Sequence, residues 1–345
     1  MLLKELENKN ILIWGFGIEG ISIFNLIKDT AKQLIVAVQN KEVMMKKYND
    51  ITFINESEIL NYQYDVVIKS SGVSKYKNEI KILISKETKI TTIQNIFLSE
   101  VSQRKNENNF PKVIGITGTK GKSTTCSMLN HMLNAMGYKS VLVGNIGISV
   151  LDILKDLEQY DYIVVEFSCY QCGMLEGILD YSIVLNLFPE HIDWHLNHDN
   201  YFNDKLNIVK NSKIAIINKK DVLTKKYLQN LENIIYFNDE NGFYLRDTFI
   251  HFKEEIVFDI KLINTINGIH IFENVCSLLT ILRYENIDLS ESMNSLNSFK
   301  TLEHRLEIFY KNEKGVLCVN DSISTIPEST TKAIETFNEH DITIL

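Results

Sequence analysis

The sequence lacks an excess of basic residues, and it has no long apolar run. Its 36 lysines and arginines are outnumbered by 44 aspartates and glutamates, which gives a formal net charge of −8. Nucleic-acid-binding proteins generally neutralise phosphates with lysine and arginine, so this balance argues against nucleic acid as a partner. No apolar run approaches the roughly 18 residues that a membrane-spanning helix needs. We therefore expect no stable membrane contact.

The cysteine content and the N-terminal residues both indicate where in the cell the protein is expected. The chain has five cysteines, an odd number spread thinly over 345 residues, which disfavours a disulfide scaffold. Residues 1–7 lack the basic-then-apolar order of a signal peptide. We therefore expect a reduced, cytoplasmic protein.

Short apolar runs alternate with helical stretches, which predicts an α/β fold with parallel strands and crossover helices. The expected strands lie at residues 11–14, 34–38, 65–68, 113–117, 140–143, 162–166, 182–187 and 213–217, and later helices at 272–284, 290–296 and 328–337. A polar stretch at 104–109, followed by Pro111, predicts a linker. We accordingly expect domains at 1–108 and 109–298, with a third beginning at 299–345.

A glycine-rich loop between an expected strand and an expected helix carries the chemistry. It consists of Gly118, Thr119, Lys120, Gly121, Lys122, Ser123 and Thr124. Glycine lets backbone N–H groups approach a phosphate closely, and the positive end of the helix dipole faces the anion. Lys122 would then reach the β- and γ-phosphates of ATP, and the Ser123 or Thr124 hydroxyl would bind Mg²⁺. The spacing is shorter than the usual Walker A pattern, and a plain glycine-rich turn is the structural alternative.

Further segments follow in an order that is similar to one known family. They are Gly144-Asn145-Ile146-Gly147, Glu166-Phe167-Ser168-Cys169-Tyr170-Gln171, Asn186-Leu187-Phe188-Pro189-Glu190-His191-Ile192-Asp193, Lys205, His304-Arg305 and Asn320-Asp321-Ser322. Together with the phosphate loop, they resemble the Mur ligase family, which builds the peptidoglycan stem peptide. The resemblance runs collinearly from about residue 11 to the last residue, and it is strongest for the glutamate-adding (MurD) type.

The resemblance implies both a fold and an activity. The implied fold is a Rossmann-like N-terminal domain for a UDP-sugar, a central P-loop-type ATPase domain with a mostly parallel sheet, and a third Rossmann-like domain for glutamate. We expect this chain to contain only the beginning of the third domain. The implied protein is an ATP-dependent ligase, acting as a monomer, that joins glutamate (D-, or alternatively L-) to UDP-N-acetylmuramoyl-L-alanine through an acyl phosphate.

The family's functional residues carry over to positions that match its motifs. Catalytic roles fall on Lys122, Glu166, His191 and Lys205. ATP contacts are expected from the loop 118–124 and from Asn274, Arg305 and Asp321. Substrate contacts are expected from Gly17, Ile18, Glu19, Gln39, Ser70, Ser71, Gly72, Asn145, Ser168 and Gln171. Two Mg²⁺ ions are expected on Ser123, Glu166, His191 and Lys205, the last as a carbamate formed with CO₂, because a bare lysine would repel the metal.

Three local motifs each have a second possible interpretation. The pattern Gly15-x-Gly17-x-x-Gly20 alone would suggest NAD, but the acidic residue expected after the next strand is missing, and Gln39 or Asn40 would instead contact a uridine. Lys210 competes with Lys205 on spacing alone, and a solvated helix lysine is the plain alternative for Lys205. The Cys-x-x-Cys at 169–172 has a redox alternative that is weak inside a substrate segment.

The histidines around residue 191 raise the question of zinc. His191, Asp193, His195 and His198 crowd together, but no matching Cys or His set completes a tetrahedral site. We expect His195 and His198 to be surface residues of a loop.

For the whole chain, two other functions stay open: a non-catalytic fragment that binds nucleotide or UDP-sugar, and a folylpolyglutamate-synthase-like ligase.

Overall fold

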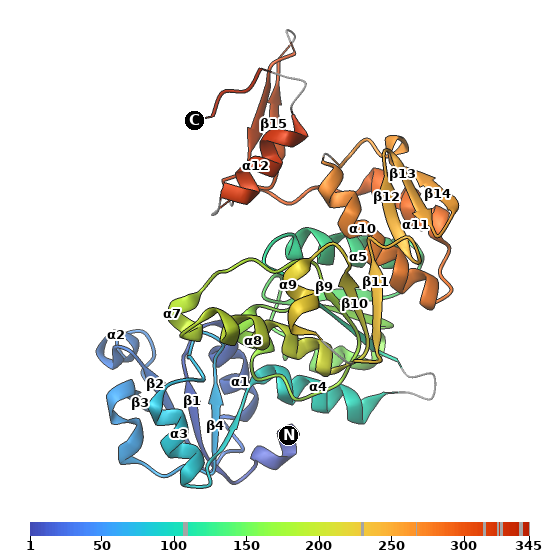
Figure 1. Cartoon of the computed structure of the whole chain (residues 1–345). Helices are drawn as coiled ribbons and strands as arrows, with labels where there is room; N and C mark the ends of the chain where they lie inside the picture. Colours follow the sequence, from blue (N-terminus) through green and yellow to red (C-terminus); the bar gives the residue numbers. More distant parts are fainter. Residues whose placement is uncertain are drawn as a thin grey trace. The chain divides into compact units, whose positions relative to one another are not determined.

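The computed structural model describes residues 1–105, 110–228, 231–266, 268–312, 315–322, 324, 327–337 and 341–344 (Figure 1). Contacts within the chain group it into two compact units. One unit comprises Met1–Thr117, Val141–Ser182 and Phe188–Ile214, and the other comprises Gly118–Ser140, Ile183–Leu187 and Ala215–Leu345. Residues 106–109 of the predicted linker, and with them the predicted boundary at 108, lie outside the described residues. The division into three domains therefore stays a prediction.

The N-terminal sheet has five parallel strands in the order β3-β2-β1-β4-β5. Its strands are β1 (Asn10–Trp14), β2 (Gln33–Val38), β3 (Phe53–Asn55), β4 (Val66–Lys69) and β5 (Lys89–Thr91). The helices between and after them are α1 (Ile18–Ile27), α2 (Lys41–Met45), α3 (Asn78–Ser85) and α4 (Ile93–Arg104). The predicted strands at 11–14, 34–38 and 65–68 are confirmed. The strands β3 and β5 were not predicted, because three residues are too few to give a period.

A second sheet has six strands in the order β11-β10-β9-β6-β8-β7. The strands are β6 (Lys112–Thr117), β7 (Ser140–Gly144), β8 (Tyr162–Glu166), β9 (Leu179–Val184), β10 (Ser212–Asn218) and β11 (Ile234–Phe237). The accompanying helices are α5 (Lys122–Ala135), α6 (Cys169–Cys172), α7 (Ile192–His195), α8 (His198–Lys210) and α9 (Val222–Tyr227). Both β6 with β8 and β10 with β11 pair in parallel. The strand predicted at 182–187 begins three residues earlier as β9.

The remaining elements form small antiparallel pairings. The strands β12 (Phe243–Arg246), β13 (Phe249–Phe252) and β14 (Glu255–Asp259) make one sheet, and β15 (Glu307–Lys311) pairs with β16 (Leu317–Asn320). The helices are α10 (Ile269–Tyr284), α11 (Leu289–Ser295) and α12 (Pro327–Thr336). The three helices predicted after residue 270 are confirmed, and so is the α/β class with mostly parallel sheets.

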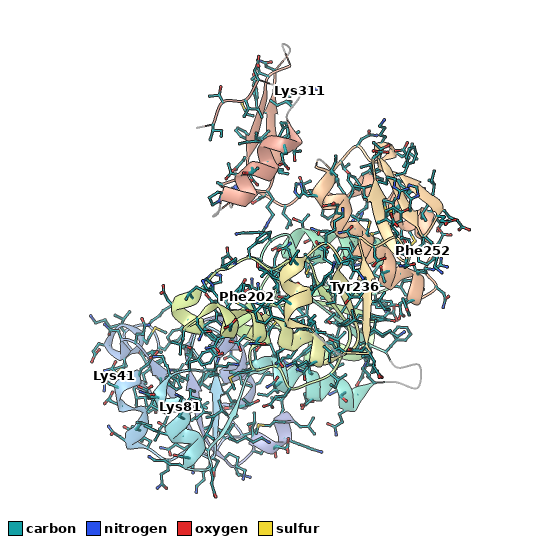
Figure 2. All side chains as sticks on the ribbon, in the orientation of Figure 1. Lys41, Lys81, Phe202, Tyr236, Phe252 and Lys311 are labelled. Carbon is teal, nitrogen blue, oxygen red and sulfur yellow. The ribbon has the colours of Figure 1, made fainter. Side chains whose placement is uncertain are left out.

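The central strands are buried, and one of them ends in a buried carboxylate. Every residue of β8 is buried, and in β1 only Asn10 is not fully buried, as expected for strands covered on both faces. Side chains such as Phe202 lie inside, whereas Lys81 and Lys311 are exposed (Figure 2). Glu166 is the last residue of β8 and is 1% exposed. A buried carboxylate at a strand end needs partners or a ligand.

Candidate functional site

A cavity of about 720 Å³ lies at the carboxyl ends of the N-terminal strands. Its lining includes most of the predicted substrate residues: Gly17, Ile18, Glu19, Gln39, Ser70, Ser71, Gly72, Asn145 and Gln171, together with Asn40. Gly15 has φ +97, and a Cβ on Gly20 would lie 2.1 Å from the Gly15 carbonyl oxygen. The tight strand-to-helix turn therefore needs both glycines. Ligands of open α/β sheets bind at such strand ends.

Glu19 is the polar centre of this cavity. Its carboxylate accepts hydrogen bonds from the Ser71 backbone N–H at 2.7 Å, from Gln94 Nε2 at 2.7 Å and from Gln171 Nε2 at 2.9 Å. Gln94 was missed in the sequence, because no motif includes it. A carboxylate with three donors is well solvated by the protein. The N-terminus of α1, where Ile18 is 76% exposed, is the part of this cavity whose backbone N–H groups suit an anion.

Ser168 and Gln171 stabilise each other at the start of α6. Ser168 Oγ accepts from the Gln171 N–H at 3.3 Å, and Gln171 Oε1 accepts from the Ser168 N–H at 2.9 Å. This reciprocal pair is a capping box. Because Gln171 also donates to Glu19, the motif that begins at Glu166 is fastened to the glycine-rich turn of the N-terminal sheet.

In the described part of the chain, one carboxylate oxygen of Glu166 accepts a hydrogen bond, and the other does not. Asn145 Nδ2 donates to Glu166 Oε1 at 2.9 Å, and the Asn145 N–H donates to the Glu166 carbonyl at 3.0 Å. Glu166 Oε2 is buried without a hydrogen-bond partner among the described residues. Burying a charged oxygen without a partner is costly. This oxygen therefore fits a hard cation such as Mg²⁺, which prefers carboxylate ligands.

His191 sits in a strained turn and remains accessible. Its φ is +55, and its side chain is 47% exposed. Its Nε2 lies 3.7 Å from Glu190 Oε2, and its ring lies 5.2 Å from the ring of Tyr170. Non-glycine residues with positive φ are uncommon and cluster at functional sites.

Lys205 and His195 are both buried. Lys205 is 2% exposed, with Nζ 4.9 Å from the centre of the Tyr201 ring. A solvated helix lysine is therefore excluded at this position, whereas Lys210 is exposed. The expectation of a surface His195 is wrong, since the residue is 0% exposed and its Nδ1 lies 2.7 Å from Asp204 Oδ2. No local pattern indicates this burial of His195, because its partner Asp204 lies nine residues farther along the chain.

The rival interpretations around these residues receive no support. Among the described residues, no group of three or more His, Cys, Asp and Glu side chains could hold a metal ion, which leaves the zinc alternative without a ligand set. Cys172 is fully buried, and burial raises the pKa of its thiol to about 12. Reactive redox thiols have a lowered pKa, so this shift in Cys172 disfavours the redox alternative.

The phosphate loop is held by Asn186 in the second unit. The Thr119 N–H donates to the Asn186 carbonyl at 3.0 Å, and the Lys120 N–H donates to Asn186 Oδ1 at 2.8 Å. Asn186 Nδ2 returns a bond to the Lys120 carbonyl at 3.0 Å. Lys122 Nζ donates to the Gly118 and Thr119 carbonyls at 2.9 and 3.1 Å. Asn186 opens the motif 186–193, yet it was not predicted as a site residue.

Three residues from later in the chain were predicted to contact ATP. Arg305 donates to Ser123 Oγ at 3.0 Å. Asn274 approaches the loop, since a Cβ on Gly121 would lie 2.8 Å from Asn274 Nδ2. Asp321 accepts a hydrogen bond from the Leu306 N–H at 3.1 Å. Arg305 and Asn274 therefore lie beside the phosphate loop, and Asp321 orders the turn that follows Arg305.

Known proteins are similar to this chain in sequence. A family model described as the Mur ligase middle domain matches residues 116–277, and one described as C2185-like, N-terminal, matches residues 7–94. The UDP-N-acetylmuramoyl-L-alanine--L-glutamate ligase of Xanthomonas euvesicatoria pv. vesicatoria (strain 85-10) is 30% identical over 356 residues, covering 100% of this chain and 75% of that protein. The chain belongs to the Mur ligase family. The resemblance predicted from the motifs is thereby confirmed.

Other Mur ligases agree in sequence and in fold. The UDP-N-acetylmuramoylalanine--D-glutamate ligase of Borreliella afzelii (strain PKo) is 30% identical, over 99% of this chain and 77% of that protein. The crystal structure of the UDP-N-acetylmuramate-alanine ligase of Thermotoga maritima matches with a TM-score of 0.58 and 18% identity, covering 96% of this chain and 78% of that one. The structural match supports the fold. Across the described ranges, no helix is both long and apolar enough to span a bilayer.

Proposed function

We propose that this Mur ligase is an ATP-dependent enzyme that joins glutamate to UDP-N-acetylmuramoyl-L-alanine in peptidoglycan precursor synthesis. The observation that carries the proposal is 30% identity, over essentially the whole chain, to ligases named for these two substrates. The phosphate loop, the strand-end cavity and the buried carboxylate of Glu166 supply the parts that such a reaction needs. The folylpolyglutamate-type alternative and the non-catalytic alternative have no comparable support.

The reaction has two steps. The alanine carboxylate of the substrate attacks the γ-phosphorus of ATP, so that an O–P bond forms and ADP leaves. The glutamate amine then attacks the acyl carbon, phosphate leaves, and the amine loses a proton as the amide forms. Lys122, which now donates to two loop carbonyls, would turn to the β- and γ-phosphates and stabilise the charge on the transferring group.

Mg²⁺ would be held by Ser123 on the ATP side and by Glu166, His191 and Lys205 as a second set. The unpartnered Oε2 of Glu166 is the observation that favours this assignment. When bound, the two ions would neutralise negative charge on the phosphoryl oxygens. Asn145 orients the Glu166 carboxylate through its other oxygen.

Lys205 would act as a carbamate rather than as an ammonium. The neutral amine adds to CO₂, an N–C bond forms, and a proton is released to solvent. The product is an anion, which suits a metal ligand, whereas a cation would repel Mg²⁺. The 2% exposure of Lys205 supports this role, because it distinguishes the residue from a solvated surface lysine.

The UDP-sugar would bind in the cavity of the N-terminal sheet. The backbone N–H groups of Gly17 and Ile18 open helix α1 and would face the diphosphate. Gln39 and Asn40 line the same cavity and would contact the uridine.

Phosphate release tests the proposed activity. The chain is incubated with ATP, Mg²⁺ and UDP-N-acetylmuramoyl-L-alanine, with L-glutamate in one series and D-glutamate in another. We expect release that depends on all components, and the series that turns over identifies the enantiomer. Glu166→Gln should lose at least 100-fold in kcat, whereas Glu100→Gln, a buried carboxylate that accepts from Leu3 and Arg104 outside the site, should not. ATP binding without turnover in either series would contradict the proposal.

A thermal-shift measurement separates this activity from that of a folate-type ligase. A ligand that binds only the folded state raises the melting temperature. We expect UDP-N-acetylmuramoyl-L-alanine to raise it and a folate to leave it unchanged. The reverse result would favour the folylpolyglutamate-type alternative.

A further inference from the structure

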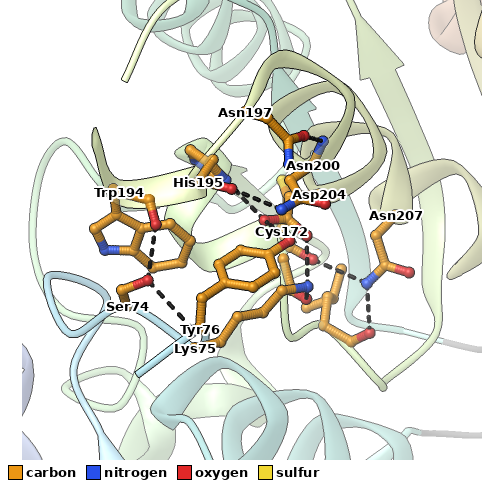
Figure 3. Close-up of polar contacts among 12 residues, drawn as sticks. Ser74, Lys75, Tyr76, Cys172, Trp194, His195, Asn197, Asn200, Asp204 and Asn207 are labelled. Carbon is orange, nitrogen blue, oxygen red and sulfur yellow. Dashed lines mark hydrogen bonds and ion pairs between the residues drawn. The ribbon is translucent and has the colours of Figure 1, made fainter. Parts of the chain in front are cut away.

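Asp204 is a buried carboxylate that the proposed reaction does not use. Its side chain is 4% exposed, and it immediately precedes Lys205 on α8. Three side chains converge on it (Figure 3): Lys75 Nζ lies 2.5 Å from Oδ1, while the Tyr76 hydroxyl at 3.1 Å and His195 Nδ1 at 2.7 Å both contact Oδ2. Gly173 lies so close that a Cβ there would be 3.1 Å from Asp204 Cγ.

Two partners of Asp204, Lys75 and Tyr76, come from the loop that follows the cavity lining. Ser74 Oγ donates to the Trp194 carbonyl at 2.7 Å, and Trp194 Nε1 donates to the Gly72 carbonyl at 3.2 Å. Lys75 also donates to the Gly173 carbonyl at 2.8 Å. The loop 72–76 is thus tied both to the end of α7 and to α8 (Figure 3).

We propose that Asp204 is a positioning residue that fixes helix α8 and so holds Lys205 where its carbamate forms. Neighbouring residues on a helix project about 100° apart. Anchoring Asp204 therefore sets the rotation of α8 about its axis and the direction of Lys205. Asn207, one turn later, reinforces the setting, since its Nδ2 donates to the Cys172 and Leu175 carbonyls at 2.9 Å each. This inference rests on the proposed carbamate of Lys205.

The test measures carbamate occupancy directly. The full chain is titrated with ¹³C-bicarbonate, the carbamate carbon is followed by ¹³C NMR, and the signal is assigned by its loss in Lys205→Ala. For Lys75→Met we expect the half-saturating bicarbonate concentration to rise at least fivefold, and the lost ligase activity to return at high bicarbonate. Tyr76→Phe, which removes only a hydroxyl, should shift the midpoint in the same direction by a smaller factor.

A matched variant controls for the loss of a buried ion pair. Lys105 and Asp180 lie 2.6 Å apart in the same unit, with side-chain exposures of 16% and 5%, close to the 25% and 4% of Lys75 and Asp204. Lys105→Met should titrate as the wild type does. Equal midpoints for the wild type, Lys75→Met and Tyr76→Phe, or an equal shift in Lys105→Met, would overturn the positioning role alone. A wild type without any carbamate signal would overturn the carbamate itself, and this inference with it.

Discussion

The Arg305 guanidinium donates a hydrogen bond to the Ser123 hydroxyl at 3.0 Å, although 182 residues separate them in the sequence. Ser123 is the second residue of α5 and is 6% exposed. A further cation therefore lies beside the loop, which already contains Lys120 and Lys122. Arginine presents several donors in a rigid fork, which suits phosphate oxygens.

Replacing Arg305 should weaken ATP binding. A hydrogen bond to a charged group is worth about 1.5–3 kcal/mol, so Arg305→Ala should raise the KM for ATP by about 10- to 100-fold. Steady-state phosphate release at varied ATP measures this. Arg246→Ala is the control, because Arg246 belongs to the same unit, is exposed, and contacts the exposed Glu240 and the Tyr244 ring. An unchanged KM for ATP in Arg305→Ala would remove Arg305 from the nucleotide site.

A pair of glycines separates backbone strain from the effect of a side chain placed in the phosphate loop beside Asn274. Gly121 has φ +84 and Gly137 has φ +86, but only at Gly121 would a Cβ meet another group, Asn274 Nδ2 at 2.8 Å. Both Gly→Ala variants should lower the free energy of unfolding by about 1–2 kcal/mol, because the left-handed conformation strains alanine. Only Gly121→Ala should also weaken ATP binding, measured by calorimetry. Equal ATP affinity in the two variants would show that the approach of Asn274 is unimportant.

Helices, strands and loops with a local sequence pattern could be predicted, whereas contacts between residues far apart in the chain could not. The phosphate loop, the buried strand ending in Glu166 and the helices after residue 270 could be predicted, because glycines, apolar runs and helical spacing are local signals. Gln94 and Asp204 could not, since their roles depend on Glu19 and Lys75, which lie far away in the chain. His195 was predicted to be a surface residue of a loop, but stacking against Tyr170 and pairing with Asp204 bury it.

Reactivity of the thiols checks the burial of the Cys-x-x-Cys pair. Cys126, Cys169, Cys172 and Cys276 are buried, and only Cys318 is partly exposed. Burial also raises the pKa of Cys172 to about 12, and the thiolate is the reactive form. Ellman's reagent should therefore modify one thiol rapidly in the native protein and all five in urea. Rapid modification of two or more native thiols, with Cys318→Ser as the reference, would contradict this packing.

Lys69 gives a pH dependence with a defined sign. The residue is 1% exposed, and burial lowers the pKa of its ammonium from 10.5 to about 8. Between these two values the unfolded chain keeps the proton and the folded chain has lost it, so rising pH favours folding. The cost of burying the charge is fully present below pH 8 and disappears toward pH 10.5. At 1.36 kcal/mol per pKa unit, it amounts to at most ~3 kcal/mol.

Lys69→Met should therefore raise the free energy of unfolding at pH 7, and the gain should shrink as the pH rises from 8 to 10.5. Methionine fills a similar volume without a charge, although the bond from Nζ to the Ser70 carbonyl at 3.2 Å is lost. Urea unfolding at pH 7, 8, 9 and 10 measures the difference from the wild type. Lys77→Met, which removes a lysine that is 39% exposed and paired with Glu56, controls for the loss of one positive charge. A Lys69→Met variant that is less stable than the wild type at pH 7, or whose difference from it does not change with pH, would show that the folded state tolerates this charge without cost.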